Sequence, residues 1–178
     1  MSAVSDPALS RALNGDEVLA DSLVRELLAA RLVAVLATHD PSGTVHAVPM
    51  WFAVEGCSAL LATASRSRKV RNLEADPHAT LVVHDSRPGF EVCGVSIAGT
   101  VDVVRGAEAT PLIELVHGRY VASGPLPAEA RAFLESDDVA LRFVPETALT
   151  WDERASGANA ALRAAGLALL LVPTDPRA

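Results

Sequence analysis

The pattern of hydrophobic and polar positions predicts a helix and then several short strands in the first part of the chain. Residues 16–30 repeat leucine and valine at helical spacing behind turn-forming residues at 14–16, which predicts a helix. Residues 32–38, 44–54 and 59–63 are short apolar runs separated by turn-forming residues, which predicts three sequential strands. Sequential strands joined by short turns form a meander, so we expect a mostly antiparallel sheet.

The rest of the chain extends this pattern towards a closed sheet. A long strand pattern at residues 90–104 is interrupted by Gly94 and Gly99, as in strands that bend where a sheet closes. The other predicted elements are helices at 70–75, 107–120 and 127–135, strands at 79–85 and 139–144, and a helical tail at 156–170. Six strands with a few flanking helices predict a small barrel of the α+β class.

The length and composition of the chain favour a single domain. With 178 residues, the chain can form one core but is short of the size at which two independent cores are expected. Hydrophobic residues make up 50% of the chain and aromatic residues only 4%, so the core must consist mainly of Ala, Val and Leu. We expect a flexible arm at residues 1–15, the barrel domain at 16–154 and a helical tail at 155–178.

The charge and the cysteine content exclude several classes of function. A formal net charge of -7 argues against a nucleic-acid binder, because such proteins neutralise phosphates with a surplus of Lys and Arg. Cys57 and Cys93 have neither metal-ligand spacing nor the pattern of a disulfide framework, so we expect no metal and a cytoplasmic location. The N-terminus lacks a secretory signal pattern, and the apolar run at 164–172 is too short for a membrane span of about 20 residues.

A short basic stretch lies between a predicted strand and a predicted helix. Its cations are Arg66, Arg68, Lys69 and Arg71, and its hydroxyl groups are those of Thr63, Ser65 and Ser67. Most charge runs are solvated helix faces, which is the competing interpretation. A strand-to-helix junction, however, exposes free backbone N–H groups and the positive end of the helix dipole. The donor set is also one that phosphate oxygens need, so we interpret the stretch as a site for one small phosphorylated ligand.

These motifs resemble those of a known family. The run Val48–Val54, a strand that ends at Thr63, the run Ser67–Leu73 and then Asp76-Pro77 before a strand resemble the pyridoxamine 5′-phosphate oxidase-like split β-barrel flavoproteins. The chain is most similar to their actinobacterial branch, the deazaflavin (coenzyme F-420)-dependent reductases. The resemblance covers about residues 20–154, with weaker matches at Arg119-Tyr120 and Thr150–Asp152. It does not extend to the Arg- and His-bearing C-terminal segment of the true oxidases, so it does not imply oxidation of pyridoxamine phosphate.

The resemblance implies a homodimer with two cofactor sites at the subunit interface. The residues that would hold the cofactor phosphate are Thr63, Ser67, Arg68 and Lys69. The residues that would border the tricyclic ring are Pro49, Met50, Trp51 and Phe52, and Trp151 of the partner chain would complete the pocket. Trp51 and Phe52 are neighbours on a strand, so their side chains should face opposite sides, one of them the core.

The expected activity is that of an oxidoreductase in which reduced coenzyme F-420, or else reduced FMN, delivers a hydride to an unsaturated small molecule. The cofactor supplies the difficult chemistry, which explains why the sequence shows no catalytic constellation of its own. The sequence has no local Ser, His and Asp signature that would support a hydrolase. Tyr120, the single tyrosine, is a candidate proton donor, although a packing role competes. Arg66 and Arg71 exceed what the FMN phosphate needs and would suit the carboxylate tail of the deazaflavin, which favours coenzyme F-420. The alternative outside catalysis is a flavin- or haem-binding carrier or sensor.

Overall fold

The computed structural model describes residues 10–87, 91–121, 137–154 and 156–166. Within these residues, eight strands form one sheet in the order β3-β2-β6-β7-β8-β5-β4, with β1 paired to β8 beside this path. The strands are β1 (Ser10–Asn14), β2 (Ala34–His39), β3 (Val45–Met50), β4 (Phe52–Glu55), β5 (Ser58–Ala64), β6 (His78–Arg87), β7 (Glu91–Val104) and β8 (Asp138–Asp152). The helices are α1 (Glu17–Ala20), α2 (Ser22–Ala29), α3 (Arg68–Ala75), α4 (Ala109–Tyr120) and α6 (Gly157–Ala164), with a 3-10 turn at Gly106–Glu108.

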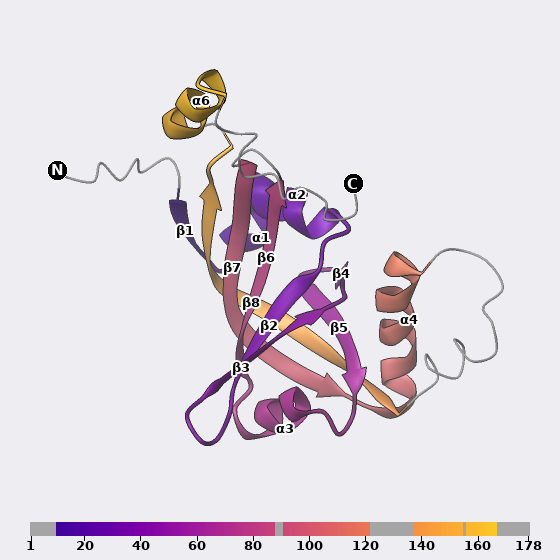
Figure 1. Cartoon of the computed structure of the whole chain (residues 1–178). Coiled ribbons are helices and arrows are strands. Elements are labelled where there is room, and N and C mark those ends of the chain that lie inside the picture. Colours follow the sequence, from indigo (N-terminus) through magenta and orange to yellow (C-terminus); the bar gives the residue numbers. More distant parts are fainter. Residues whose placement is uncertain (1–9, 88–90, 122–136, 155, 167–178) are drawn as a thin grey trace, which may run out of the picture.

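The sheet is antiparallel and curled into a half-barrel. Every strand pairing among the described residues is antiparallel, which confirms the predicted α+β class and the split-barrel architecture. Figure 1 shows the long strands β7 and β8 curving across the molecule, with α3 at the lower end and α1 and α2 at the upper end. The expected number of six strands was too low, because β1 was not foreseen and the run 44–54 forms two strands.

The predicted strand at 44–54 breaks at Trp51, and this break shapes the whole sheet. β3 pairs with β2 at one edge of the sheet, whereas β4 pairs with β5 at the other edge. The expected simple meander is therefore wrong: the two halves of one predicted strand lie at opposite edges and are joined only through Trp51. The backbone N–H of Phe52, the first residue of β4, donates to the hydroxyl of Tyr120 (3.3 Å).

The N-terminal part of the domain also differs from the prediction. Residues 10–14, expected within a flexible arm, form β1 and pair with residues 147–151 of β8. The predicted helix at 16–30 is split into α1 and α2 by Asp21, whose carboxylate accepts hydrogen bonds from the backbone N–H groups of Leu23 (2.9 Å) and Val24 (3.1 Å). An Asp in this geometry is a strong N-cap, so a new helix begins at residue 22.

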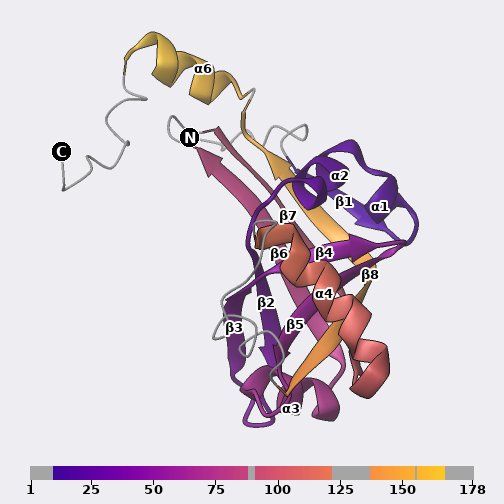
Figure 2. The same cartoon turned by 90° about the vertical axis from the view of Figure 1, so that its right-hand side faces the viewer.

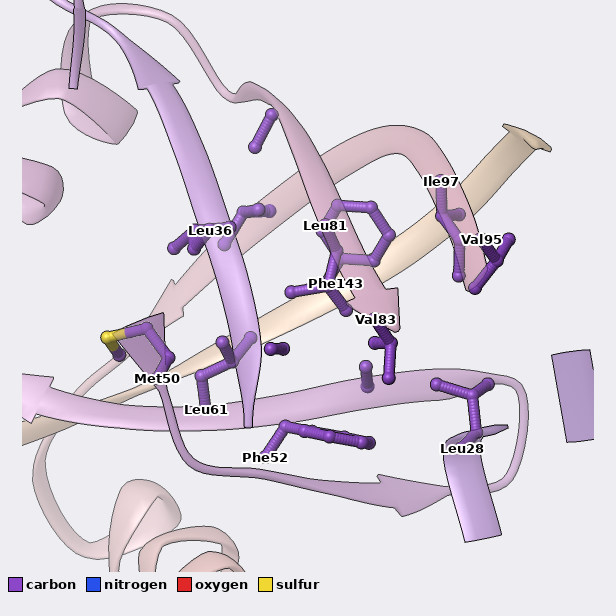
Figure 3. Packing of buried hydrophobic residues seen from close by; sticks show 14 of the residues in the cluster. Leu28, Leu36, Met50, Phe52, Leu61, Leu81, Val83, Val95, Ile97 and Phe143 are labelled. Atoms are coloured by element: carbon purple, nitrogen blue, oxygen red, sulfur yellow. The ribbon is translucent and has the colours of Figure 1, made fainter. Parts of the chain in front are cut away.

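The main core fills the interior of the curled sheet. Its largest fully buried side chains include Phe52, Phe143, Leu36, Leu61 and Leu81, which Figure 3 shows converging from different strands. Apart from Phe52, Phe143, Met50 and Cys93, the buried residues of this core are Ala, Val, Leu and Ile, close to what the composition predicted. A second cluster lies outside the barrel, where α4 packs against β4, β5 and β8 (Figure 2). Its members are Ala53, Leu60, Ala109, Leu112, Ile113, Val116 and Ala140.

The two glycines of β7 have different roles. At Gly99 the pairing of β7 with β8 shifts register, and a Cβ atom there would lie 2.1 Å from the backbone oxygen of Val144. The predicted bend is therefore confirmed at Gly99, where a bulge brings two backbones close together. At Gly94 the register is regular, but a Cβ atom would lie 2.2 Å from Cζ2 of Trp151, so this glycine makes room for an indole.

Some predicted segments fall outside the described residues. These are the helix at 127–135, residues 1–9 of the arm and the end of the tail from 167 onwards. In the described part of the tail, α6 covers Gly157–Ala164. No helix in the described part of the chain is both long and apolar enough to cross a membrane.

Candidate functional site

A pocket of about 420 Å³ opens where the β3–β4 corner, the end of β5, α4 and the start of β8 meet. Its lining is mostly apolar, with Thr63, His117 and Asp138 as the polar residues. The lining residues are Pro49, Met50, Trp51, Ala62, Thr63, Ala64, Val116, His117 and Asp138. Three of the four predicted ring-binding residues, Pro49, Met50 and Trp51, are thus brought together with Thr63 of the predicted phosphate site.

The aromatic wall of this pocket is the indole of Trp51. Trp51 is 42% exposed, and its neighbour Phe52 is completely buried, so the predicted alternation is confirmed with Phe52 in the core. The indole stacks on the ring of Tyr120, with centroids 5.0 Å apart and planes 5° from parallel. The ring of His117 meets it edge-on at 6.3 Å. The indole is thus backed by two side chains of α4, which presents it as a firm flat surface.

Tyr120 supports this wall and does not line the pocket. Its hydroxyl group donates to the backbone oxygen of Leu32 and accepts from the N–H of Phe52. The neighbouring Arg119 donates to the carbonyl oxygens of Leu28 and Ala30, and its guanidinium lies 4.5 Å from the centroid of the Phe52 ring. The structure therefore commits the phenolic proton to the protein backbone, and the geometry favours the packing role over proton donation.

Of the predicted phosphate donors, Thr63 lines the pocket, and Lys69 lies behind it, outside the lining but in contact with the Thr63 hydroxyl. The ammonium group of Lys69 lies 2.8 Å from Oγ1 of Thr63, and the hydroxyl of Ser67 lies 3.4 Å from the same oxygen. Burial lowers the pKa of Lys69, and the charge of Asp138 partly opposes this shift. A partly desolvated ammonium beside two hydroxyl groups gains from an anionic ligand, so these three side chains form a suitable donor set for phosphate.

The other predicted cations point elsewhere in this structure. The guanidinium of Arg68 is bound to the carboxylate of Asp40 in the β2–β3 turn, with Nε at 3.0 Å and Nη2 at 2.8 Å. Two hydrogen bonds from Ser42, followed by the one from Arg68, lower the pKa of Asp40 to about 2. Arg71 donates to the backbone oxygen of Arg66 (2.7 Å). These arginines surround the Lys69 site but do not line the pocket.

The helix that carries Lys69 is fixed to the barrel by a buried polar contact. Asn72 is 1% exposed and donates through Nδ2 to Oγ1 of Thr38 (3.0 Å), which is itself fully buried on β2. Val70 and Leu73 of the same helix belong to the main core. Asn72, Val70 and Leu73 anchor α3 on the barrel. Ser67, Arg68 and Lys69 are therefore held at the beginning of this helix, close to the end of β5.

Five lining residues were not identified from the sequence, and two of them, His117 and Asp138, have ionisable side chains. Burial lowers the pKa of His117, again opposed by the charge of Asp138. The signal for His117 was its position one helical turn before Tyr120, on the same face of α4. The first residue of β8, Asp138, reaches the pocket because β8 pairs with the end of β5. No cluster of three metal-ligating side chains occurs among the described residues.

Trp151 lies away from this pocket within the chain. β8 is 15 residues long, and Asp138 and Trp151 are at its two ends, roughly 45 Å apart along the strand at about 3.3 Å per residue. Trp151 packs over Gly94 of β7 and pairs with Ser10 of β1. A role for Trp151 at the pocket would therefore require a second copy of the chain.

Comparison with known proteins agrees with this geometry. Residues 20–152 match the family model described as pyridoxamine 5′-phosphate oxidase. The chain belongs to the pyridoxamine 5′-phosphate oxidase family. The family model spans β2 to β8 and thus includes every residue that lines the pocket. No curated protein sequence matches the chain.

Solved structures show the same split-barrel fold in proteins that carry different names. A conserved hypothetical protein, Rv2991 from Mycobacterium tuberculosis, is 26% identical, with 80% of this chain and 91% of that chain covered and a TM-score of 0.63. A protein named F420 reductase is 29% identical, with coverages of 70% and 94% and a TM-score of 0.55. HutZ, a haem storage protein from Vibrio cholerae, is 18% identical, with coverages of 72% and 92% and a TM-score of 0.58, which shows the fold alone.

Proposed function

We propose that this family member binds a phosphorylated flavin or deazaflavin, preferentially coenzyme F-420, and transfers a hydride from it to an unsaturated small molecule. The observation that carries the proposal is a pocket lined by both Trp51 and Thr63, where the hydroxyl of Thr63 is in contact with the ammonium group of Lys69. A tricyclic ring with a phosphate-bearing side chain has the same division into a flat apolar part and an anionic end. The similarity to a protein named F420 reductase supports the deazaflavin.

The residues present fit such a cofactor, and each would have a definite task. Lys69, Thr63 and Ser67 would hold the phosphate by charge-assisted hydrogen bonds. Pro49, Met50 and Trp51 would border the ring and keep one side of it away from water. When bound, the cofactor supplies the hydride, so the chain needs only to bind it, orient it and shield it. His117 is placed to hold or move a proton near the aromatic wall, since an imidazole titrates close to neutral pH.

The preference for the deazaflavin rests on the positive charges around Lys69. FMN carries one phosphate, for which Lys69 and the two hydroxyl groups suffice, whereas coenzyme F-420 continues into a tail with further carboxylates. Arg66 and Arg71 are exposed and are linked by the hydrogen bond from Arg71 to the Arg66 carbonyl, so their charges remain close to this site. Partly exposed cations attract a flexible anionic tail and are screened by salt.

We further propose that the protein is a symmetric homodimer in a reducing cytoplasm, with the pocket at the interface. Trp51 at the corner beside the pocket and Val54 on β4 are each 42% exposed, and Val45 at the other end of β3 is 62% exposed, so these strands carry apolar surface that a second copy would cover. Trp151 would then reach the pocket from the partner chain. Light scattering at micromolar concentration should give twice the chain mass of 18.6 kDa, and the monomer mass would remove the interface model.

The deciding experiment is a titration of the purified protein with FMN and with coenzyme F-420, followed by ligand fluorescence. We expect both to bind and the deazaflavin to bind more tightly, with an affinity that falls more steeply as salt increases. Arg71→Ala should weaken the deazaflavin and leave FMN nearly unaffected. Stoichiometric co-purification of FMN, with equal effects of Arg71→Ala on both ligands, would replace the deazaflavin by FMN.

A third outcome would point to a non-catalytic protein. Haem binding with a Soret band, in the absence of flavin or deazaflavin affinity, would indicate a carrier or sensor on the same barrel. Failure of all three ligands to bind would leave the basic stretch as a solvated face and overturn the proposal. Once the cofactor is known, its reduced form can be offered to panels of unsaturated acceptors, since the loops that shape substrate pockets vary independently of the fold.

A further inference from the structure

An acidic side chain lies in the pocket where the proposed ligand is anionic. Asp138 lines the pocket together with Thr63 and is half-buried. Its negative charge acts on Lys69 of the donor set and also on His117 beside the aromatic wall. A carboxylate in such a place repels a phosphate and weakens its binding, unless the ligand offers something in return.

The strand pairing places Asp138 on the side of the pocket that faces α4. In the register of β5 with β8, Asp138 is opposite Ala64, and the next residue, Val139, is opposite Thr63. The side chain of Asp138 is thus on the same face as Ala64 and Ala140, next to α4, whereas the side chain of Thr63 points to the other face, towards Lys69. His117 of α4 connects the same pocket to the indole of Trp51. A ligand that fills this pocket from the indole to Thr63 would therefore have Asp138 along its side.

The chemistry of a carboxylate indicates what it would recognise there. An ionised carboxylate only accepts hydrogen bonds, and its two oxygens offer about four acceptor positions. In flavins and deazaflavins, the ring and the phosphate are joined by a ribityl chain that carries hydroxyl donors. We propose that Asp138 binds the hydroxyl groups of this polyol chain and thereby selects ligands in which ring and phosphate are linked by a polyol. This inference rests on the proposed function and adds a third subsite to it.

A simpler role for Asp138 is that of a counter-ion for Lys69 and His117. The two roles differ in what they predict for ligands without a phosphate. A counter-ion changes the affinity for every anionic ligand and treats riboflavin and lumiflavin alike, because both are uncharged at neutral pH. A polyol acceptor changes the affinity only for ligands with the ribityl chain, which riboflavin has and lumiflavin lacks.

The test measures the affinities of lumiflavin, riboflavin and FMN by fluorescence titration of the full chain, with the 10-methyl and 10-ribityl 5-deazaflavins as the parallel pair. The variants are Asp138→Ala, the isosteric Asp138→Asn and the matched control Asp137→Asn. Asp137 lies outside the pocket lining, and its carboxylate accepts from the hydroxyl of Ser65 (2.5 Å), so the control removes the same charge nearby. Circular dichroism confirms that each variant is folded.

We expect Asp138→Ala to weaken riboflavin and FMN about tenfold or more, the fold-change for a lost hydrogen bond to a charged group, and to change lumiflavin less than about twofold. Asp137→Asn should leave the ratio of riboflavin to lumiflavin affinity unchanged. An unchanged ratio in both Asp138 variants, with FMN binding more tightly, would establish the counter-ion role and overturn the inference. If Lys69→Ala still weakened FMN in that case, the proposed function would stand without the polyol subsite. Failure of the wild type to bind any of these ligands would overturn both.

Discussion

Lys69 and Arg68 are neighbours in the basic stretch, but the structure predicts unequal contributions to cofactor binding. The ammonium group of Lys69 is partly desolvated and lies 2.8 Å from Oγ1 of Thr63 at the pocket, whereas the guanidinium of Arg68 is bound to Asp40 outside it. A hydrogen bond to a charged group contributes about 1.5–3 kcal/mol. Lys69→Ala should therefore weaken FMN and coenzyme F-420 roughly ten- to hundred-fold. Arg68 would have to leave an exposed ion pair worth at most about 1 kcal/mol, so Arg68→Ala should cost less than about fivefold.

The measurement is a fluorescence titration of the two ligands at fixed salt, because ionic strength alters exposed charge contacts. Arg105→Ala is a matched control. Arg105 pairs with Glu74 near the other end of α3 (2.6 Å), so this substitution also removes one cation but leaves the basic stretch unchanged. The pH dependence gives a second readout. Lys69 loses its charge as the pH rises, so the affinity for the phosphorylated ligand should fall on the alkaline side. Because burial lowers the pKa of Lys69, this fall should begin at a lower pH than for an ordinary lysine, and Lys69→Arg should abolish it. Equal affinities in the wild type and Lys69→Ala, or an equal loss in Arg68→Ala, would refute the reasoning.

Three further predictions concern the scaffold and are measured by urea denaturation. Asn72→Ala should lower the free energy of unfolding by about 1–3 kcal/mol, because the buried hydroxyl of Thr38 loses the hydrogen bond that Asn72 donates to it. Adding Thr38→Val to this variant should recover part of the loss. Gly99→Ala should lower the free energy of unfolding by more than about 3 kcal/mol, since a Cβ atom would lie 2.1 Å from the backbone oxygen of Val144. The control Gly118→Ala, at an open position of α4, should be neutral or stabilising by up to about 1 kcal/mol. Asp40→Asn should destabilise the protein above pH 4, because a carboxyl whose pKa is lowered from 3.8 to about 2 contributes its full stability above the unfolded value. The difference should shrink as the pH falls through the folded value of about 2, and a constant difference would contradict this.

Local patterns were sufficient for much of the fold and for part of the pocket. The alternation of a strand placed Phe52 and Trp51 on opposite sides, and the structure has Phe52 in the core and Trp51 exposed. The position of the basic stretch at a strand-to-helix junction is also observed, with β5 ending at Ala64 and α3 beginning at Arg68. These features depend on residues a few positions apart, so the side-chain periods of strands and helices carry them in the sequence.

Only the tertiary structure decided how the strand at 44–54 divides and which charges face the pocket. Its two halves lie at opposite edges of the sheet because β3 pairs with β2 and β4 pairs with β5. The N–H of Phe52 donates to Tyr120 of α4, a helix far away in the sequence. Arg68 is drawn away from the pocket by Asp40, while Asp138 is brought to it by the pairing of β8 with β5. Hydrophobic periodicity states which side of an element is buried, but the partner of a charged side chain depends on elements that meet only when the sheet curls.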